Sequence, residues 1–572
     1  MKASKKRGFT IIELVIVIAV IAILAAVLIP TFANIIQKAN VANDVALARN
    51  MNTILIADEA TNGRSTDMYD VLIALEQGGF KLENLNPRAD GNVFAWDKAN
   101  NQIVYLDKKN PDKPIFQAKE IGDNKGDLYI TTRKAEVFAD YPGYSYYFAS
   151  DISGNITLDE GSCLDTGEFA LTGDVSVVTD KDVEIHGTIN GTITVDSTSG
   201  KITNYSVVNN KVVIKNTAAT SYHERGHVAA MEIQNSLTGK VVLENDAYVE
   251  KLTNNRTSGT VESKGYVKAV DGSDTTSVTA TQSGYVLEIG TYDQLVNFRN
   301  KVNAGASYSG MTVKLTADID ISERAWTPIG AAHRDKIEAQ TNVFQGTFDG
   351  QGHKITGLTN TGFKISSVFK GSNSTTPEGY SEYVFGLFGS VYNATIKNIV
   401  MANVNIDLGC DEKEKVVGDS VGAIVGYAAG TNVTIDSCKV LSGSIVGYDA
   451  VAGIIGRTYS AKTTISNCEN AATVTAIRRA CGILGFASAS KAKTVAITNC
   501  KNSGNVKQTG TPTTDPAGKG QEGNYGYYKV AGLAIYQAKS EKIDTTGSSN
   551  TGTVTLTVPE EGKNKSDTVL YY

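Results

Sequence analysis

The stretch that decides the fold reads KKRGFTIIEL over residues 5–14, and it opens an apolar run that continues to Ile29. Between residues 9 and 29 one side chain is ionisable, that of Glu13. Basic residues gather just before the run: Lys2, Lys5, Lys6 and Arg7. A helix over residues 9–29 would be roughly 31 Å long, close to the hydrocarbon thickness of a bilayer. The pattern therefore predicts a transmembrane helix at residues 9–29.

The charges around this helix predict its orientation and single out Glu13. Basic residues on the leader side favour a cytoplasmic leader, so everything after Pro30 is expected outside the cytoplasm. A carboxylate within a membrane helix costs on the order of 3 kcal/mol on insertion scales and usually marks function. Glu13 therefore requires a cationic partner to offset its burial.

Gly8, Phe9, Thr10, Glu13 and Pro30 together resemble the start of a type IV prepilin. The resemblance implies a leader at residues 1–8, which a prepilin peptidase cuts between Gly8 and Phe9 before the new amino group of Phe9 is methylated. It also implies that Glu13 meets the terminal amine of a neighbouring subunit during assembly and that Pro30 kinks the helix. A plain signal anchor with an incidental glutamate is the alternative.

The composition is that of a globular rather than a disordered protein, and the length predicts several modules. The chain has 572 residues, of which 41% are hydrophobic and 20% charged, and its net charge is -6 before the basic leader is removed. This acidic balance, without a clustered basic face, argues against nucleic acid as a partner. No motif predicts a cofactor.

Local signals after the membrane helix predict a small α/β head. Helical periodicity continues from Thr31 to about Asp58, and Gly63 is expected to end that helix. A second helix is expected between Thr66 and Gly78, followed by a hairpin of residues 92–96 and 102–106. With the resemblance, these elements imply a type IV pilin-like domain over residues 9–115.

Residues 116–285 are expected to be β-rich, because an Ile/Leu-x-Asn triplet recurs there. The triplets end at Asn204, Asn216, Asn235, Asn245 and Asn254. Recurrence at irregular intervals suggests short stacked strands, each closed by a turn-forming asparagine.

Residues 286–572 repeat more regularly, after a short expected capping helix at residues 290–303. Gly-apolar-apolar-Gly units begin at Gly386, Gly453 and Gly482, and a strand such as Thr464–Cys468 follows each unit. A period of about 30 residues with two or three short strands predicts a parallel β-solenoid. The stretch resembles the GLUG-type repeats of bacterial surface proteins. The fold class is therefore mainly β with an N-terminal α-helical membrane stalk.

Six cysteines occur without close pairing, at positions 163, 410, 438, 468, 481 and 500. An exported protein can oxidise its thiols. The repeat context instead favours reduced thiols packed in the core.

One pentapeptide, His223-Glu224-Arg225-Gly226-His227, fits the H-E-x-x-H pattern of zinc peptidases. Gly226 weakens a helix, and strand-like triplets flank the motif on both sides. Glu244 or Glu250 would have to serve as the third ligand. A polar loop is the preferred interpretation, so no metal is predicted, with His223, Glu224 and His227 kept as candidates.

The remaining candidates for chemistry are interpreted as surface or structural groups. His186 has a strand-turn context, His333 a charged loop and His353 a turn. Asp318 and Asp320 share one face of an expected strand. An acidic loop holds Asp407, Asp411, Glu412 and Glu414.

The sequence thus predicts a type IV pilin-like surface subunit, not an enzyme, and one whose large head favours a minor or tip-proximal place. Its expected partners are the prepilin peptidase/methylase, other pilin subunits with their assembly machinery, and the inner or cytoplasmic membrane. The head is expected to bind a host or environmental glycan or protein. The precursor is expected in the membrane and the product in a surface pilus. The alternatives are a membrane-tethered β-helix enzyme acting on polysaccharide, a zinc peptidase, or a pseudopilin of a secretion machine.

Overall fold

The computed structural model divides into two compact units, Met1–Ile202 and Thr203–Tyr572. The residues that it describes are 11–65, 67–81, 85–158, 161–197, 199–217, 222–281, 284–322, 324–330, 342–360, 381–409, 416–492, 494–511, 514–515, 527–538, 542–558 and 564–571.

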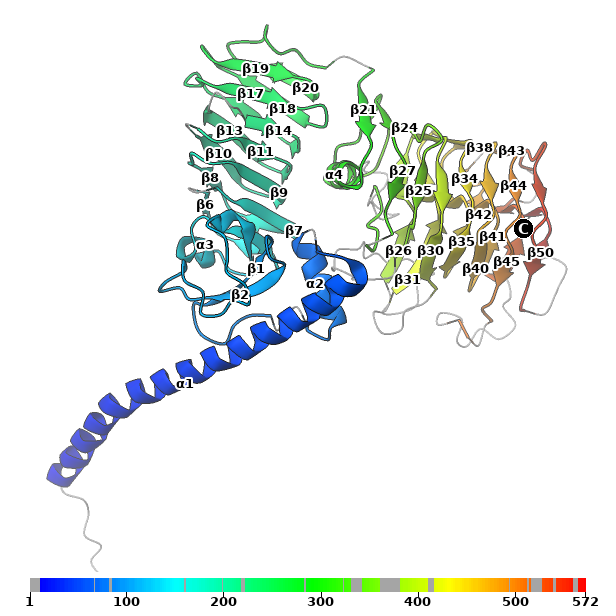
Figure 1. Ribbon diagram of the computed structural model, residues 1–572. Coiled ribbons are helices and arrows are strands. Elements are labelled where there is room, and N and C mark those ends of the chain that lie inside the picture. Colours follow the sequence, from blue (N-terminus) through cyan, green and yellow to red (C-terminus); the bar gives the residue numbers. More distant parts are fainter. Residues whose placement is uncertain are drawn as a thin grey trace, which may run out of the picture. The chain divides into compact units, whose positions relative to one another are not determined.

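The first unit begins with α1 (Ile11–Asn62), a continuous helix of 52 residues that includes Pro30 (Figure 1). Its Leu14–Thr61 part contains a window with a mean hydropathy of 3.1, none of it buried by the protein, so the helix is long and apolar enough to cross a membrane. Gly63 follows with φ +88°, a left-handed conformation that suits glycine. The expected helix and its end are confirmed.

The C-terminal half of α1 packs on a small head. The head contains α2 (Met68–Gln77) and an antiparallel hairpin of β1 (Val93–Asp97) and β2 (Gln102–Leu106). Asp67 caps α2 by accepting from the amide of Asp70 at 3.0 Å, and Gly78 ends it. The second helix and the hairpin are thus confirmed.

Two buried polar side chains attach α1 to this head. Asn52 donates to the carbonyl of Ile103 at 2.8 Å and accepts from its amide at 2.8 Å. Asp44 accepts from the amide of Ala89 and from the hydroxyl of Tyr105, each at 2.9 Å. Each side chain satisfies backbone or hydroxyl groups that burial would otherwise leave unpaired.

The hairpin leads into parallel strands within the same unit. The next strand, β3 (Leu128–Thr132), pairs antiparallel with β1 and parallel with β4 (Ser145–Phe148). Further parallel pairs join β7 (Cys163–Thr172) to β9 (Val183–Ile189), and β8 (Val175–Val177) to β10 (Thr192–Asp196).

In the second unit, the region of the Ile/Leu-x-Asn triplets forms parallel strands. The ladder of β14 (Tyr222–Glu224), β17 (Lys240–Leu243) and β19 (Thr260–Ser263) is parallel throughout. A second ladder joins β15 (His227–Val228), β18 (Tyr248–Asn254) and β20 (Tyr266–Asp271). The β-rich character expected here is confirmed.

Helix α4 (Tyr292–Asn303) lies where a capping helix was expected, and the hydroxyl of its N-cap Thr291 accepts from the amide of Gln294. Leu295, Phe298 and Val302 are buried in the core shared with the following strands. The helix therefore covers apolar surface that the first strands leave open.

The strands from β21 (Val286–Ile289) onward form five parallel sheets of five to seven strands each (Figure 1). From β26 (Ser381–Phe385) to β45 (Val506–Gln508), each repeat supplies one strand to each sheet. The repeat after Asp449 contains β36 (Ala450–Ala452), β37 (Ile455–Thr458), β38 (Lys462–Ser466), β39 (Glu469–Asn470) and β40 (Thr473–Ala476). The repeat therefore has five short strands, not the two or three that the sequence suggested.

Successive repeats pair in register, so equivalent residues form columns. Ile435 pairs with Ile465 and Ile465 with Ile497, and all three are fully buried. Cys438, Cys468, Cys481 and Cys500 are also buried, and all are free thiols. The described cysteines in the repeats thus pack in the core as predicted, whereas Cys410 lies outside the described residues.

The glycines of the repeat units at 453 and 482 do not occupy left-handed turn positions. Left-handed turn positions are held by Asn398, Ser437, Asn467 and Asn499, with φ between 53° and 56°. A Cβ on Gly482 would instead lie 2.2 Å from the carbonyl oxygen of Gly532, and one on Gly453 would lie 2.6 Å from the carbonyl oxygen of Gly482. These glycines permit close approach between neighbouring repeats.

We predict that Gly482→Ala destabilises the second unit by about 3 kcal/mol, because its methyl group overlaps a backbone oxygen that cannot move alone. Lys491→Ala, at an exposed turn position, serves as the control and should leave stability within about 0.5 kcal/mol. Thermal unfolding followed by circular dichroism measures both. Equal melting temperatures for the two variants would contradict the register described here.

Candidate functional site

The processing segment lies largely outside the described residues. Gly8, Phe9 and the side chain of Glu13 belong to that part, whereas Pro30 lies within α1. The described part of the helix leaves its large apolar side chains exposed from Ile11 to Ile36. An apolar surface of this extent marks a membrane or protein contact.

The H-E-x-x-H pentapeptide does not form a helix. His223 and Glu224 end β14, His227 begins β15, and the two strands belong to different ladders. The two histidines consequently contact different carboxylates. His223 Nδ1 lies 2.6 Å from Oε1 of Glu244, and His227 Nε2 lies 3.6 Å from Oε1 of Glu250. The ligand set of a zinc peptidase is therefore not assembled by these residues.

Glu224 is a buried structural group in this arrangement. Both of its oxygens accept from the Asn204 amide at 3.0 Å, and they also accept from the Tyr222 hydroxyl at 2.6 Å and the Gly226 amide at 2.7 Å. Burial raises the pKa of Glu224 to about 7, although these hydrogen bonds and the charge of Lys301 favour the carboxylate. Gly226 is required by packing, because its Cβ would lie 2.0 Å from the carbonyl oxygen of Ser206.

Among the other described sequence candidates, Asp318 and His353 are in contact with each other. Asp318 accepts from the Lys354 amide at 2.9 Å and lies 3.3 Å from Nδ1 of His353, whereas Asp320 accepts from the Ser322 amide at 2.9 Å. Both aspartates are exposed, as is Asp407. His333, Asp411, Glu412 and Glu414 lie outside the described residues. His186 lies on β9 beside Glu184, with Nε2 3.4 Å from Oε2.

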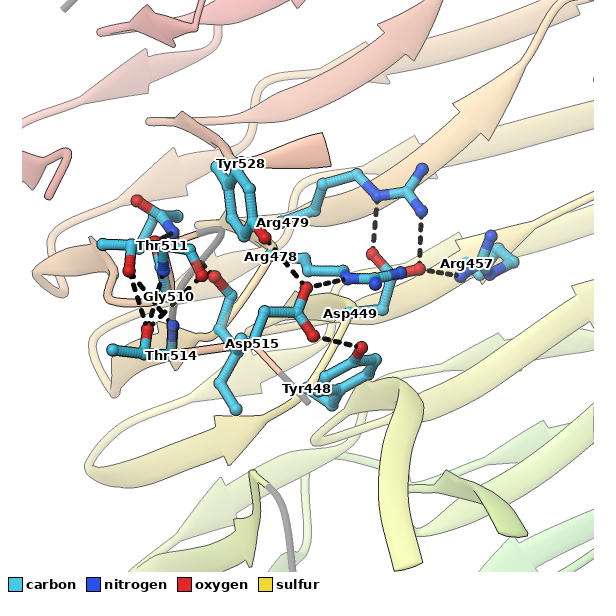
Figure 2. A network of polar contacts seen from close by, with 12 residues as sticks. Tyr448, Asp449, Arg457, Arg478, Arg479, Gly510, Thr511, Thr514, Asp515 and Tyr528 are labelled. Atoms are coloured by element: carbon cyan, nitrogen blue, oxygen red, sulfur yellow. Dashed lines mark hydrogen bonds and ion pairs between the residues drawn. The ribbon is translucent and has the colours of Figure 1, made fainter. Parts of the chain in front are cut away.

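A buried ionic network in the second unit was not predicted from the sequence (Figure 2). Asp449 accepts from Nε of Arg479 at 2.6 Å, from its Nη2 at 2.5 Å, and from Nη2 of Arg457 at 3.0 Å. Arg457 also donates to Asp419 at 3.2 Å. Burial alone would raise the pKa of Asp449, but Arg479 and Arg457 outweigh it and hold that pKa below its usual range.

The network continues to a second carboxylate. Asp515 accepts from Nε of Arg478 at 2.7 Å and from the hydroxyls of Tyr448 at 2.6 Å and Tyr528 at 3.1 Å (Figure 2). Arg478 also lies over the Tyr448 ring, 4.8 Å from its centroid. These groups hold one another in place across repeats, which is a structural arrangement. In the strand register, Arg457 is opposite Tyr427 and Phe486 of the neighbouring repeats. The arrangement can therefore be recognised only once the strands have been paired.

Comparison with known proteins supports the N-terminal assignment. The family described as "Prokaryotic N-terminal methylation motif" matches residues 3–29. The "Type IV major fimbrial protein FimA" of Dichelobacter nodosus is 35% identical over 94 residues, which are 16% of this chain and 57% of that protein. A "Fimbrial protein" of Moraxella nonliquefaciens is 44% identical over 98 residues, which are 16% of this chain and 63% of that protein.

A third relative matches a longer part of the chain. "Halomucin" of Haloquadratum walsbyi is 28% identical over 293 residues, which are 50% of this chain and 3% of halomucin. The chain thus spans less than two thirds of each of these relatives. No solved structure matches it.

The chain therefore has a prepilin-type N-terminus. The methylation motif, the apolar helix α1 and the fimbrial relatives support a membrane-anchored precursor and a surface pilus as its locations. The same relatives point to a structural rather than an enzymatic protein.

We predict that Glu224→Gln removes a pH dependence from the stability of the second unit. The pKa of Glu224 is about 7 when folded and 4.5 in its ordinary state, so its protonated form stabilises the fold below about pH 4.5 and this stabilisation is lost as the pH rises through 7. Between pH 4.5 and 8 the free energy of unfolding of the wild type should fall by about 3 kcal/mol relative to the variant. Urea titrations across this range measure the difference. Parallel curves would contradict the assignment.

We also predict that Asp449→Asn destabilises the second unit by about 3 to 5 kcal/mol, because two buried guanidinium groups lose their shared carboxylate. The control is Glu469→Gln, which breaks the exposed 3.0 Å pair with Lys439 and should cost under about 1 kcal/mol. Chemical denaturation compares the two. Similar losses would show that the network does not hold its repeats together.

Proposed function

We propose that this chain is a type IV pilin-like subunit with a minor or tip-proximal place in a surface filament, and that it displays a β-solenoid head for adhesion. The observation that carries the proposal is α1, whose first half exposes apolar side chains and whose second half is anchored to a folded head. In this proposal the leader is residues 1–8 and the membrane helix is residues 9–29. The pilin-like domain spans residues 9–115, followed by a β-rich region at 116–285 and repeats of GLUG type at 286–572.

The five parallel sheets support the solenoid part of the proposal. Each repeat has its strands paired with those of the preceding and the following repeat, and the apolar columns lie between the sheets. Short strands bury a core in this way only by stacking. Such an array is a rigid, elongated surface on which outward side chains recur at a constant spacing.

The size of the head supports a minor or tip-proximal place. Pilin-type helices pack closely in a filament, and a head of over 450 residues beyond the pilin-like domain leaves little room for identical neighbours. A subunit at the tip meets no such limit, and it is the one that first reaches a surface. The acidic chain favours a glycan or protein ligand over nucleic acid.

The proposed partners follow from the N-terminal motif. A prepilin peptidase cuts after Gly8 and methylates Phe9, and the carboxylate of Glu13 then pairs with the terminal amine of an adjacent subunit in the filament. The inner or cytoplasmic membrane holds the precursor until assembly.

Two substitutions test this proposal. Gly8→Val should block cleavage, so the protein retains all eight leader residues, which N-terminal mass spectrometry detects. Glu13→Gln should insert and be cleaved normally, but its incorporation into filaments should fall sharply because the attractive charge is removed. Immunolabelling of sheared filaments measures incorporation. Wild-type assembly of the Glu13 variant, or a mature N-terminus other than Phe9, would refute the mechanism.

Adhesion is tested separately, on an array of glycans and matrix proteins. Sheared filaments from wild-type cells should bind at least one ligand that filaments from cells lacking this chain do not bind. Equal binding by both preparations would refute the adhesive role and leave the filament proposal standing.

A further inference from the structure

We propose that Cys163, Glu184 and His186 form a binding site for a transition-metal ion, with Zn²⁺ as the best match. The Sγ atom of the cysteine, a carboxylate oxygen of the glutamate and a ring nitrogen of the histidine all lie within 4.8 Å of one another. Three ligand types that bind Zn²⁺ thus converge at one point of the first unit.

The strand register explains why these residues meet. In the parallel pair of β7 and β9, Cys163 is opposite Glu184 and Asp165 is opposite His186. Alternate residues of a strand point to opposite faces of the sheet. Leu164 and Ile185 are fully buried, so they face the core. Cys163 and Asp165 on β7 and Glu184 and His186 on β9 therefore share the outward face.

This outward face is accessible to an ion. The side chain of His186 is 33% exposed and that of Glu184 is 55% exposed. Cys163 is half-buried, and its amide donates to Oγ of Ser145 at 3.0 Å, which holds the start of β7 in place. The site therefore has one sheltered ligand and two that solvent can reach.

The distances fit a tetrahedral ion after small side-chain rotations. His186 Nε2 lies 3.4 Å from Oε2 of Glu184. With bonds of about 2.0 to 2.3 Å, tetrahedral ligand atoms lie roughly 3.3 to 3.8 Å apart. Three protein ligands leave a fourth position, which water or the nearby Asp165 can take.

The ligand set selects the class of metal. Sulfur and imidazole nitrogen suit Zn²⁺ and neighbouring transition metals, whereas Mg²⁺ and Ca²⁺ require mostly oxygen ligands. A strand that carries Glu-x-His places both side chains on one face, and the adjacent strand supplies the cysteine. An ion here would link β7 to β9 and stabilise this first unit in proportion to its binding.

The other thiols and histidines differ in their surroundings. Cys438, Cys468 and Cys500 are buried among repeat strands, where Sγ of Cys468 contacts the carbonyl oxygen of Ser466 at 3.1 Å. His223 and His227 each face a different glutamate. Among the residues that the structure describes, no other group of this kind brings three such ligand atoms together.

Lys98 provides a second way to test the site. Its ammonium lies over the Tyr129 ring, 5.8 Å from the centroid, and its positive charge acts on both Cys163 and Glu184. The positive charge of the Lys98 ammonium repels a metal ion bound by Cys163 and Glu184. Lys98→Ala should therefore tighten metal binding by a few-fold.

The experiment uses the purified full chain in detergent, stripped with EDTA and then titrated with Co²⁺ and Zn²⁺. One Co²⁺ per chain should bind with a thiolate-to-cobalt charge-transfer band in the near ultraviolet, and Zn²⁺ should displace it. Cys163→Ser and His186→Ala should weaken binding by about 100-fold or more and abolish the band.

The controls separate this site from the remaining thiols and histidines of the chain. Cys438→Ser and His223→Ala should retain the full affinity and the band, whereas Glu184→Gln, at an exposed position, should weaken binding but keep the band. Circular dichroism confirms that each variant is folded. The proposal is overturned if the wild type binds no stoichiometric metal, if Cys163→Ser binds as tightly as the wild type, or if His223→Ala removes the ion.

Discussion

The spacing between neighbouring parallel strands, about 4.8 Å, is the constraint on which the β-rich part of this chain depends. It places equivalent residues of successive repeats in direct contact, so a column of one residue type requires a side chain that packs on copies of itself. Isoleucine does so in the core, as at Ile435, Ile465 and Ile497. Asparagine does so through its amide, since Asn470 donates to Asn502 at 2.8 Å and Asn502 donates to Asn550 at 2.7 Å.

The same spacing also brings buried charged side chains of neighbouring repeats into contact. Arg457 and Arg479 share Asp449 between them, Arg457 also donates to Asp419, and both lie over the aromatic ring of Phe486. These contacts offset the repulsion within a register pair of like charges, such as Arg479 with Lys529. Each guanidinium therefore has partners in more than one repeat. Removing a single carboxylate affects several repeats at once, whereas the exposed pair of Lys439 and Glu469 can be lost locally.

The sequence predicted the elements whose signals are local, namely the C-terminal end of α1, the ends of α2, the hairpin and the repeat period. Strands of two residues, such as Glu469–Asn470, show no alternation, which is why five strands per repeat were not foreseen.

Candidate sites were harder to predict, because they depend on the register in which the strands pair. The H-E-x-x-H pattern assumes a helix, and a β conformation separates its histidines. Conversely, Cys163 and His186 are distant in the sequence, and only the pairing of β7 with β9 brings them together. The buried network around Asp449 was missed for the same reason.

Helix α1 limits where the chain can reside. Seventeen large apolar side chains between Ile11 and Ile36 are exposed, and each contributes about 1.5 to 3 kcal/mol when it is removed from water. Leaving all of them in water would cost on the order of tens of kcal/mol, more than the roughly 5 to 15 kcal/mol by which a folded domain is usually stable. Free release of single chains is therefore strongly disfavoured. This half of α1 must pass directly from lipid to another apolar surface, and bundled helices of neighbouring subunits in the proposed filament provide one outside the membrane.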